Sequence, residues 1–181
     1  MLILRCTRKL RMKNLGPVGG LQDSLVPTLG TWHANLVYLA RWPIVLIVND
    51  HSLLSVIVAG RQFPNILSVI TARIGERLRR MGLSDELLLH EQAAMDVVEV
   101  QPTNSKSVLG SMNDFVNALK WRGRDWFDME ALDDLEDMLS ATPMGALNYQ
   151  YPIEVAYQVF ETTKEKIEET RACESDETFH I

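Results

Sequence analysis

The sequence has few cysteines, no long apolar run and none of the common catalytic motifs. Its two cysteines, Cys6 and Cys173, lie near opposite ends of the 181-residue chain, so neither a disulfide scaffold nor a cysteine-bound metal site is predicted. The longest strongly apolar stretch, residues 43–48, is far shorter than the ~20 residues of a membrane-spanning helix. The patterns HExxH, GxSxG, GxGxxG and the P-loop are absent. We therefore expect no membrane span, no metal and no cofactor.

The composition is that of an ordinary globular protein, with 46% hydrophobic and 23% charged residues, and the length suits one core. The net charge of −6 hides a polarity along the chain. Residues 1–123 hold 14 basic and 9 acidic residues, whereas residues 124–181 hold 4 basic and 15 acidic residues. We expect a core domain over 1–123 and an acidic helical extension over 124–181 that docks on it and frays from about residue 172.

Three β-rich runs predict the centre of the sheet. Residues 35–40, 44–48 and 53–58 are separated by two short turns, a pattern that indicates an antiparallel meander. The middle run is continuously apolar, so both faces of that strand should be covered. A short opening strand within residues 1–10 and a further run at 96–101 extend the prediction to an antiparallel sheet of about four or five strands.

Helical periodicity dominates the rest of the chain, so the predicted fold class is α+β, with the sheet packed by helices. The helix around residues 103–122 has the clearest pattern, with an apolar stripe that includes Phe115. Gly110 lies inside this helix at a cost of about 1 kcal/mol relative to alanine, which suggests close approach by a neighbouring element or a ligand. The expected helices cover residues 65–80, 84–94, 103–122, 125–139 and 152–170.

Three segments carry a resemblance to a known family: residues 1–10 (MLILRCTRKL), 29–36 (LGTWHANL) and 107–115 (SVLGSMNDF). Together they resemble a bacterial family of small, uncharacterised cytoplasmic proteins known as a domain of unknown function. The third segment is also similar to part of the plasmid Orf3-like proteins of mobile elements. The resemblance implies a compact α+β fold and transfers no chemistry. Where the family is expected to carry Asp, Tyr and Arg, this chain has Thr31, His33 and Lys106.

The start of the 103–122 helix is a candidate anion or partner contact. Its capping side chains, its unpaired backbone N–H groups and one positive charge are suited to a phosphate or a carboxylate. Asparagine and serine also cap helices that bind nothing, so simple capping is the competing interpretation. The candidate residues are Asn104, Ser105, Lys106 and Ser107.

A second candidate site joins two loops of the meander. His33 precedes the first strand and Asp50 lies in the second turn, so both belong to the same end of the sheet. A histidine beside a carboxylate is the minimum for acid–base chemistry. With His51 and Asp114, these residues would serve a hydrolase or nuclease-like enzyme. Residues 49–52 are also good turn formers, which is the competing interpretation.

Basic residues near the N-terminus and in the 65–80 helix form the third candidate. On one face they would follow a nucleic-acid backbone, with Trp32 or Trp42 available for stacking. The competing interpretations are a solvated surface and pairing with the acidic segment. The basic residues are Arg5, Arg8, Lys9, Arg11, Lys13, Arg73, Arg77, Arg79 and Arg80.

The leading hypothesis is a bacterial, non-enzymatic binding or regulatory protein that contacts a protein or nucleic acid, with association with mobile elements as one option. The hydrolase or nuclease-like enzyme is the alternative. The apolar first residues precede a basic stretch, the reverse of the order in a signal peptide, so a cytoplasmic location is expected. The predicted contact residues are Asn104, Ser105, Lys106, Ser107, Arg77, Arg80 and Trp32.

Overall fold

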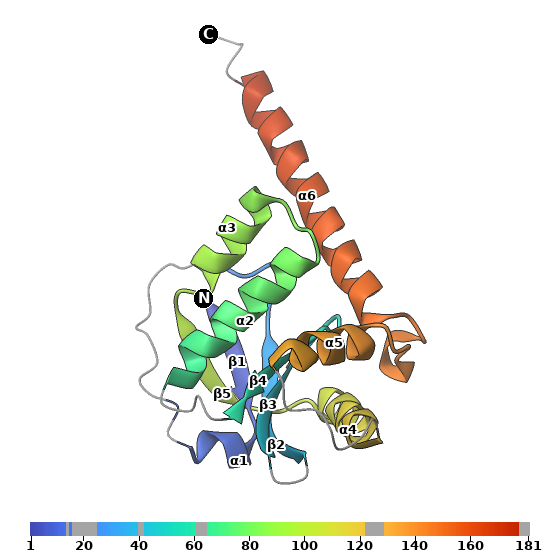
Figure 1. Ribbon diagram of the computed structural model, residues 1–181. Coiled ribbons are helices and arrows are strands. Elements are labelled where there is room, and N and C mark those ends of the chain that lie inside the picture. The colour runs from blue at the N-terminus through green and yellow to red at the C-terminus, as the bar shows by residue number, and fades with distance from the viewer. Residues whose placement is uncertain (14, 16–24, 40–41, 61–64, 122–128, 178–181) are drawn as a thin grey trace.

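The computed structural model describes residues 1–13, 15, 25–39, 42–60, 65–121 and 129–177. Five strands form one sheet in the order β4-β3-β2-β1-β5, and helices lie on both of its sides (Figure 1). The strands are β1 (Leu2–Cys6), β2 (Trp32–Leu39), β3 (Trp42–Asn49), β4 (Ser55–Ala59) and β5 (Val98–Pro102). The helices are α1 (Arg8–Arg11), α2 (Ile66–Arg80), α3 (Asp85–Ala94), α4 (Lys106–Trp121), α5 (Met129–Ser140), the 3-10 turn η2 (Gly145–Leu147) and α6 (Pro152–Glu177).

The predicted meander is confirmed in β2, β3 and β4. β3 pairs antiparallel with β2, from Trp32 opposite Asn49 to Leu39 opposite Trp42, and antiparallel with β4. Residues 44–49 of β3 are all buried, as expected of a strand covered on both faces. The α+β class is likewise confirmed.

The prediction that the whole sheet is antiparallel is wrong. β1 pairs parallel with β2 on one side and parallel with β5 on the other, so the sheet is mixed. The chain reaches β2 from β1, and β5 from β4, through long connections that contain helices, and such crossovers join parallel strands. The alternation of side chains shows which face a residue occupies but not the direction of the neighbouring strand.

Two apolar clusters hold the helices against the sheet. On one face, the predicted stripe of α2, including Ile70 and Ile74, packs with β1 and with Phe160 of α6. On the other face, Phe115 of α4 and Leu135 of α5 pack against β2, β3 and β4. α5 therefore contributes buried side chains to this cluster although its sequence is strongly acidic. Among the described helices, none is both long and apolar enough to cross a membrane.

Two details of the helices differ from the prediction. Gly110 is exposed on α4, and a Cβ atom built there meets no described atom within 4 Å, so neither close packing nor backbone approach explains this glycine. α6 continues to Glu177, beyond the predicted end at residue 170.

Cys6 is buried with a free thiol, and burial raises the pKa of that thiol to about 12. The side chain of Cys173 and residues 178–181 of the predicted frayed tail lie outside the described part of the chain.

Candidate functional site

The face of the sheet that carries α4 is divided into an apolar and a polar part. Beneath α4 and α5, residues of β2, β3 and β4 form the apolar cluster. On β5, β1 and the start of β2, the register places Gln101, Arg5 and His33 side by side in one row across the strands. Thr103 and Asn104 follow directly after β5. We call these five residues the polar sheet face.

The polar sheet face lies where the chain, on leaving two neighbouring parallel strands, turns to opposite sides of the sheet. After β1 the chain enters α1, whose Leu10 packs in the cluster on the α2 side. After β5 it enters α4, which packs on the other side, and Figure 1 shows α1 and α4 near the same end of the sheet. In open α/β sheets, ligands bind outside the carboxyl ends of the strands at such a switch point. The topology therefore favours this position for a ligand.

His33 is fully buried, and both of its ring nitrogens have a partner. Nδ1 lies 2.9 Å from Oγ1 of Thr103, and Nε2 lies 3.1 Å from Oδ1 of Asp50, whose side chain is 40% exposed. Burial lowers the pKa of His33, and this effect outweighs the carboxylate of Asp50, which raises it; the charge of Arg5 lowers it further. The imidazole is therefore neutral at pH 7. Sequence reasoning found His33 and Asp50 but missed Thr103.

Asp50 is held in place by the turn chemistry that residues 49–52 were expected to show. The buried Asn49 donates through Nδ2 to the carbonyl groups of Leu29 (2.8 Å) and Thr31 (3.1 Å). Its Oδ1 accepts from the backbone N–H groups of His51 and Ser52. The backbone N–H of Asp50 also donates to the carbonyl of Thr31. The turn is thus both well capped and rigidly placed beside His33.

Arg5 gives the polar sheet face its positive charge. The side chain is half-buried, and Nη1 donates to Oδ1 of Asn104 at the surface. Among the described residues Arg5 forms no ion pair, and its Nε is buried without a hydrogen-bond partner. Arg5 was predicted only as part of a general basic surface. Its alternation with the buried Leu4 and Cys6 is the sequence signal that places it on this face.

Of the residues predicted as an anion contact at the start of α4, one caps the helix, one accepts from Arg5, and two are exposed. The Oγ of Ser105 accepts from the backbone N–H of Val108 (3.3 Å), as the capping interpretation expects. Asn104 accepts from Arg5, and Lys106 and Ser107 are exposed.

The structure does not bring the remaining predicted catalytic and stacking residues to this face. His51 is exposed in the turn after Asp50, and Asp114 is exposed on α4, with no contact to His33 or Asp50 described for either side chain. Trp32 is 1% exposed in the core on the α2 side of the sheet. A nucleic-acid base cannot reach it without unfolding.

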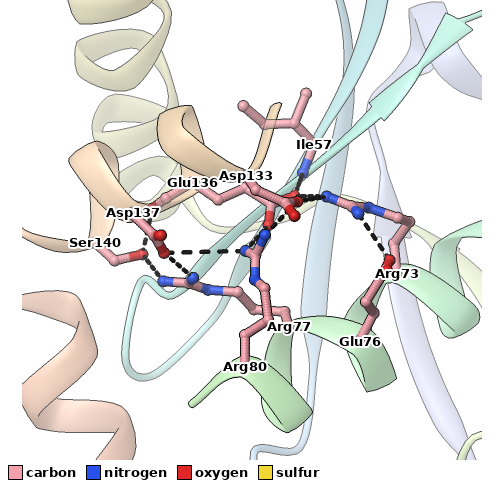
Figure 2. Close-up of polar contacts among 9 residues, drawn as sticks. All are labelled: Ile57, Arg73, Glu76, Arg77, Arg80, Asp133, Glu136, Asp137 and Ser140. Carbon is pink, nitrogen blue, oxygen red and sulfur yellow. Dashed lines mark hydrogen bonds and ion pairs between the residues drawn. The ribbon is translucent and has the colours of Figure 1, made fainter. Parts of the chain in front are cut away.

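Three of the four predicted basic residues of α2 pair with the acidic helix α5 (Figure 2), and the fourth, Arg79, is exposed. Arg73 lies 2.7 Å from carboxylate oxygens of both Asp133 and Glu136, and Arg80 pairs with the same two residues. Arg77, only 3% exposed, pairs with Asp137 and donates to Oγ of Ser140. This is the pairing that the sequence suggested as an alternative to an open basic surface.

Glu136 is the centre of this arginine cluster. Its buried carboxylate accepts from Arg73, from Arg80 and from the backbone N–H of Ile57 on the edge strand β4 (2.8 Å). Burial raises the pKa of Glu136 against these hydrogen bonds, whereas the hydrogen bonds from Arg80 and Arg73 lower the pKa of Asp133 despite its partial burial. Arg73, Arg77 and Arg80 of α2 are thus neutralised within the protein.

Both candidate regions lie within one family domain. A protein-family model described as "Domain of unknown function (DUF6933)" matches residues 3–155. The chain belongs to this family. A search of the curated proteins found no match. The matched range contains every residue of the polar sheet face and of the arginine cluster.

Two hollows in the described surface lie away from the polar sheet face. A groove of about 730 Å³ between α2, the end of α3 and Val98 is lined by both charges, Glu76, Arg79 and Asp96. A smaller hollow of about 260 Å³ includes Arg77 and Arg80 of the arginine cluster. Within the described part of the chain, no group of three acidic, histidine or cysteine side chains is placed to hold a metal ion.

Proposed function

We propose that the protein binds a small anionic ligand, a carboxylate or a phosphate, on the polar sheet face. The observation that carries this proposal is Arg5, a half-buried cation that forms no ion pair with the described residues. An incoming anion gains a charge-assisted hydrogen bond from Arg5 without first breaking an ion pair.

Two further features support an anion at this position. The start of α4 presents backbone N–H groups and the positive end of the helix dipole, and Lys106 begins that helix. The carboxylate of Asp50 is directed to Nε2 of His33, 3.1 Å away. The ligand is therefore expected to contact Arg5 and the start of α4.

This proposal keeps the binding role of the leading hypothesis but changes the ligand. Arg77 and Arg80 are engaged by α5 and Trp32 is buried, so these three residues do not support a nucleic-acid contact. Asn104, Ser105, Lys106 and Ser107 remain as proposed contacts, joined now by Arg5. A regulatory role, a bacterial and mobile-element origin and a cytoplasmic location stay predictions.

The proposal is tested by calorimetric titration of the full chain with inorganic phosphate and with succinate at low salt. Arg5→Gln is expected to weaken binding by about 10- to 100-fold, since a hydrogen bond to a charged group contributes about 1.5–3 kcal/mol. Arg79→Gln, in an exposed arginine of α2, is the matched control and should bind as the wild type does. Equal binding by the Arg5 variant, or no heat beyond that of potassium chloride, contradicts the proposal.

The enzyme of the alternative hypothesis is the second candidate function. Its support is the contact between His33 and Asp50, at 3.1 Å. His51 and Asp114 take no part in that contact, so a catalytic role would rest on a different set of residues.

A further inference from the structure

The hydrogen bonds of His33 fix which nitrogen carries its proton. A carboxylate only accepts hydrogen bonds, so Nε2 carries the hydrogen that is donated to Asp50. The ring is neutral, and Nδ1 therefore has a free lone pair. That lone pair accepts from the hydroxyl of Thr103 at 2.9 Å.

This order, carboxylate to imidazole to hydroxyl, is the arrangement that activates a hydroxyl nucleophile. The imidazole takes the hydroxyl proton, and the carboxylate orients the ring and stabilises the imidazolium that forms. Here the two ring nitrogens have exchanged roles, because Nδ1 faces the hydroxyl and Nε2 faces the carboxylate. A structural histidine also satisfies both nitrogens, but it requires neither a carboxylate nor a hydroxyl in particular.

We propose that Thr103 is a catalytic nucleophile and that the protein cleaves small esters that carry an anionic group. The substrate class rests on the proposed function, because Arg5 beside His33 would hold the anionic group. Thr103 is half-buried directly after β5, next to Asn104, which accepts from Arg5. Thr103, the proposed nucleophile, and Asn104, a proposed anion contact, are therefore adjacent in the chain.

The reaction has two steps. In the first step Oγ1 of Thr103 forms a bond to the carbonyl carbon of the ester, and its proton passes to Nδ1 of His33. The bond from that carbon to the alcohol oxygen then breaks, and His33 returns the proton to the departing alcohol. In the second step a water molecule attacks the acyl group on Thr103 with the same proton transfers, which releases the acid and restores the threonine.

The test follows release of 4-nitrophenol from the neutral 4-nitrophenyl acetate and from mono-4-nitrophenyl succinate, whose free carboxylate suits Arg5. Peptide mass spectrometry locates the acyl group. The wild type is expected to prefer the succinate ester and to carry the acyl group on Thr103. Thr103→Val should lower the rate by about 100-fold or more, and Thr103→Ser should restore most of it.

The controls separate this proposal from a structural effect. Thr7→Val removes another half-buried hydroxyl nearby, one that bonds to Asn35 and not to His33, and should hydrolyse both esters like the wild type. A denaturant titration of each variant shows that it is folded. A wild type no faster than the unfolded chain, or a folded Thr103→Val with the wild-type rate, overturns the proposal.

The two proposals fail in different ways. If phosphate and succinate bind through Arg5 but ester cleavage does not depend on Thr103, the nucleophile is wrong and the anion site stands. If Thr103 is acylated but the two esters react at equal rates, the nucleophile stands and the anion site is wrong. Arg5→Gln is expected to abolish the preference for the succinate ester.

Discussion

The two groups of cations in this protein differ in what lies opposite their charge. Between α2 and α5, three arginines meet three carboxylates, and Glu136 also binds the free backbone edge of β4 (Figure 2). On the polar sheet face, Arg5 meets an amide and lies beside a neutral imidazole. An unpartnered Nε is common to Arg5, Arg73 and Arg77, so the counter-ion is what distinguishes them. The comparison teaches that pairing, and not the number of basic residues, identifies a cation available to a ligand.

The largest expected effect tests whether the arginine cluster between α2 and α5 stabilises the fold. Glu136→Ala removes a buried carboxylate and leaves Arg73, Arg80 and the N–H of Ile57 without it. We expect a loss of about 3–5 kcal/mol in the free energy of unfolding, measured by urea titration. Asp134→Ala, on the exposed side of the same helix, should change it by less than about 0.5 kcal/mol. A small effect of Glu136→Ala would mean that the arginine cluster is not structural.

Asn49→Ala tests whether the turn beside His33 is also held in place by specific hydrogen bonds. The change removes the hydrogen bonds that Asn49 makes to two carbonyl groups and two N–H groups in and beside the turn. We expect a loss of about 2–3 kcal/mol. His51→Ala in the same turn removes an exposed side chain and is the control, with a loss below about 0.5 kcal/mol. Equal stability of the Asn49 variant would show that the turn does not hold Asp50 in place.

Two glycines offer a smaller test. Because a Cβ atom at Gly110 meets nothing, Gly110→Ala should stabilise the protein by about 1 kcal/mol through helix propensity. At Gly60 a Cβ atom would lie 2.6 Å from the carbonyl oxygen of Pro43, so Gly60→Ala should instead destabilise it by about 1–3 kcal/mol. A destabilised Gly110→Ala would indicate that another part of the protein approaches α4.

The smallest expected effect is the pH dependence contributed by His33. Its folded-state pKa is lowered, so the unfolded chain takes up a proton as the pH falls below about 6.5, while the folded state resists it. Stability should therefore fall between about pH 7.5 and about pH 5.5, and less so in His33→Gln. Urea titrations at the two pH values measure this, with His51→Gln as the control. If the stability of His33→Gln depended on pH as that of the wild type does, the ring of His33 would be in contact with solvent in the folded wild type.

Local patterns predicted most of the elements and only part of the site. The meander and the helices follow from periodicity and turn residues near each other in the sequence. The parallel neighbours of β1 depend on long crossovers, which local patterns do not encode. His33 and Asp50 were found because two loops share one sheet end. Thr103 was missed, and Arg5 was predicted only as part of a basic surface, because their meeting with His33 depends on β1 lying between β2 and β5.

The charge pattern was informative about pairing but not about the site. The net positive and net negative segments suggested attraction between them, and α2 and α5 realise it through Arg73, Arg77 and Arg80. Burial of Trp32 was not visible, because an aromatic side chain at the start of a strand suits a core and a surface equally. Contact residues selected by charge or aromaticity alone therefore fell partly in structural positions.

The most direct test of the account is an NMR titration that follows the Nε–H signals of the arginine side chains as inorganic phosphate is added. The account predicts a saturable shift of the Arg5 signal, whereas the signals of Arg73 and Arg77, which already face carboxylates, stay in place. A stationary Arg5 signal, or the same gradual drift in all three arginines, would contradict the claim that Arg5 is the cation this protein keeps for a ligand.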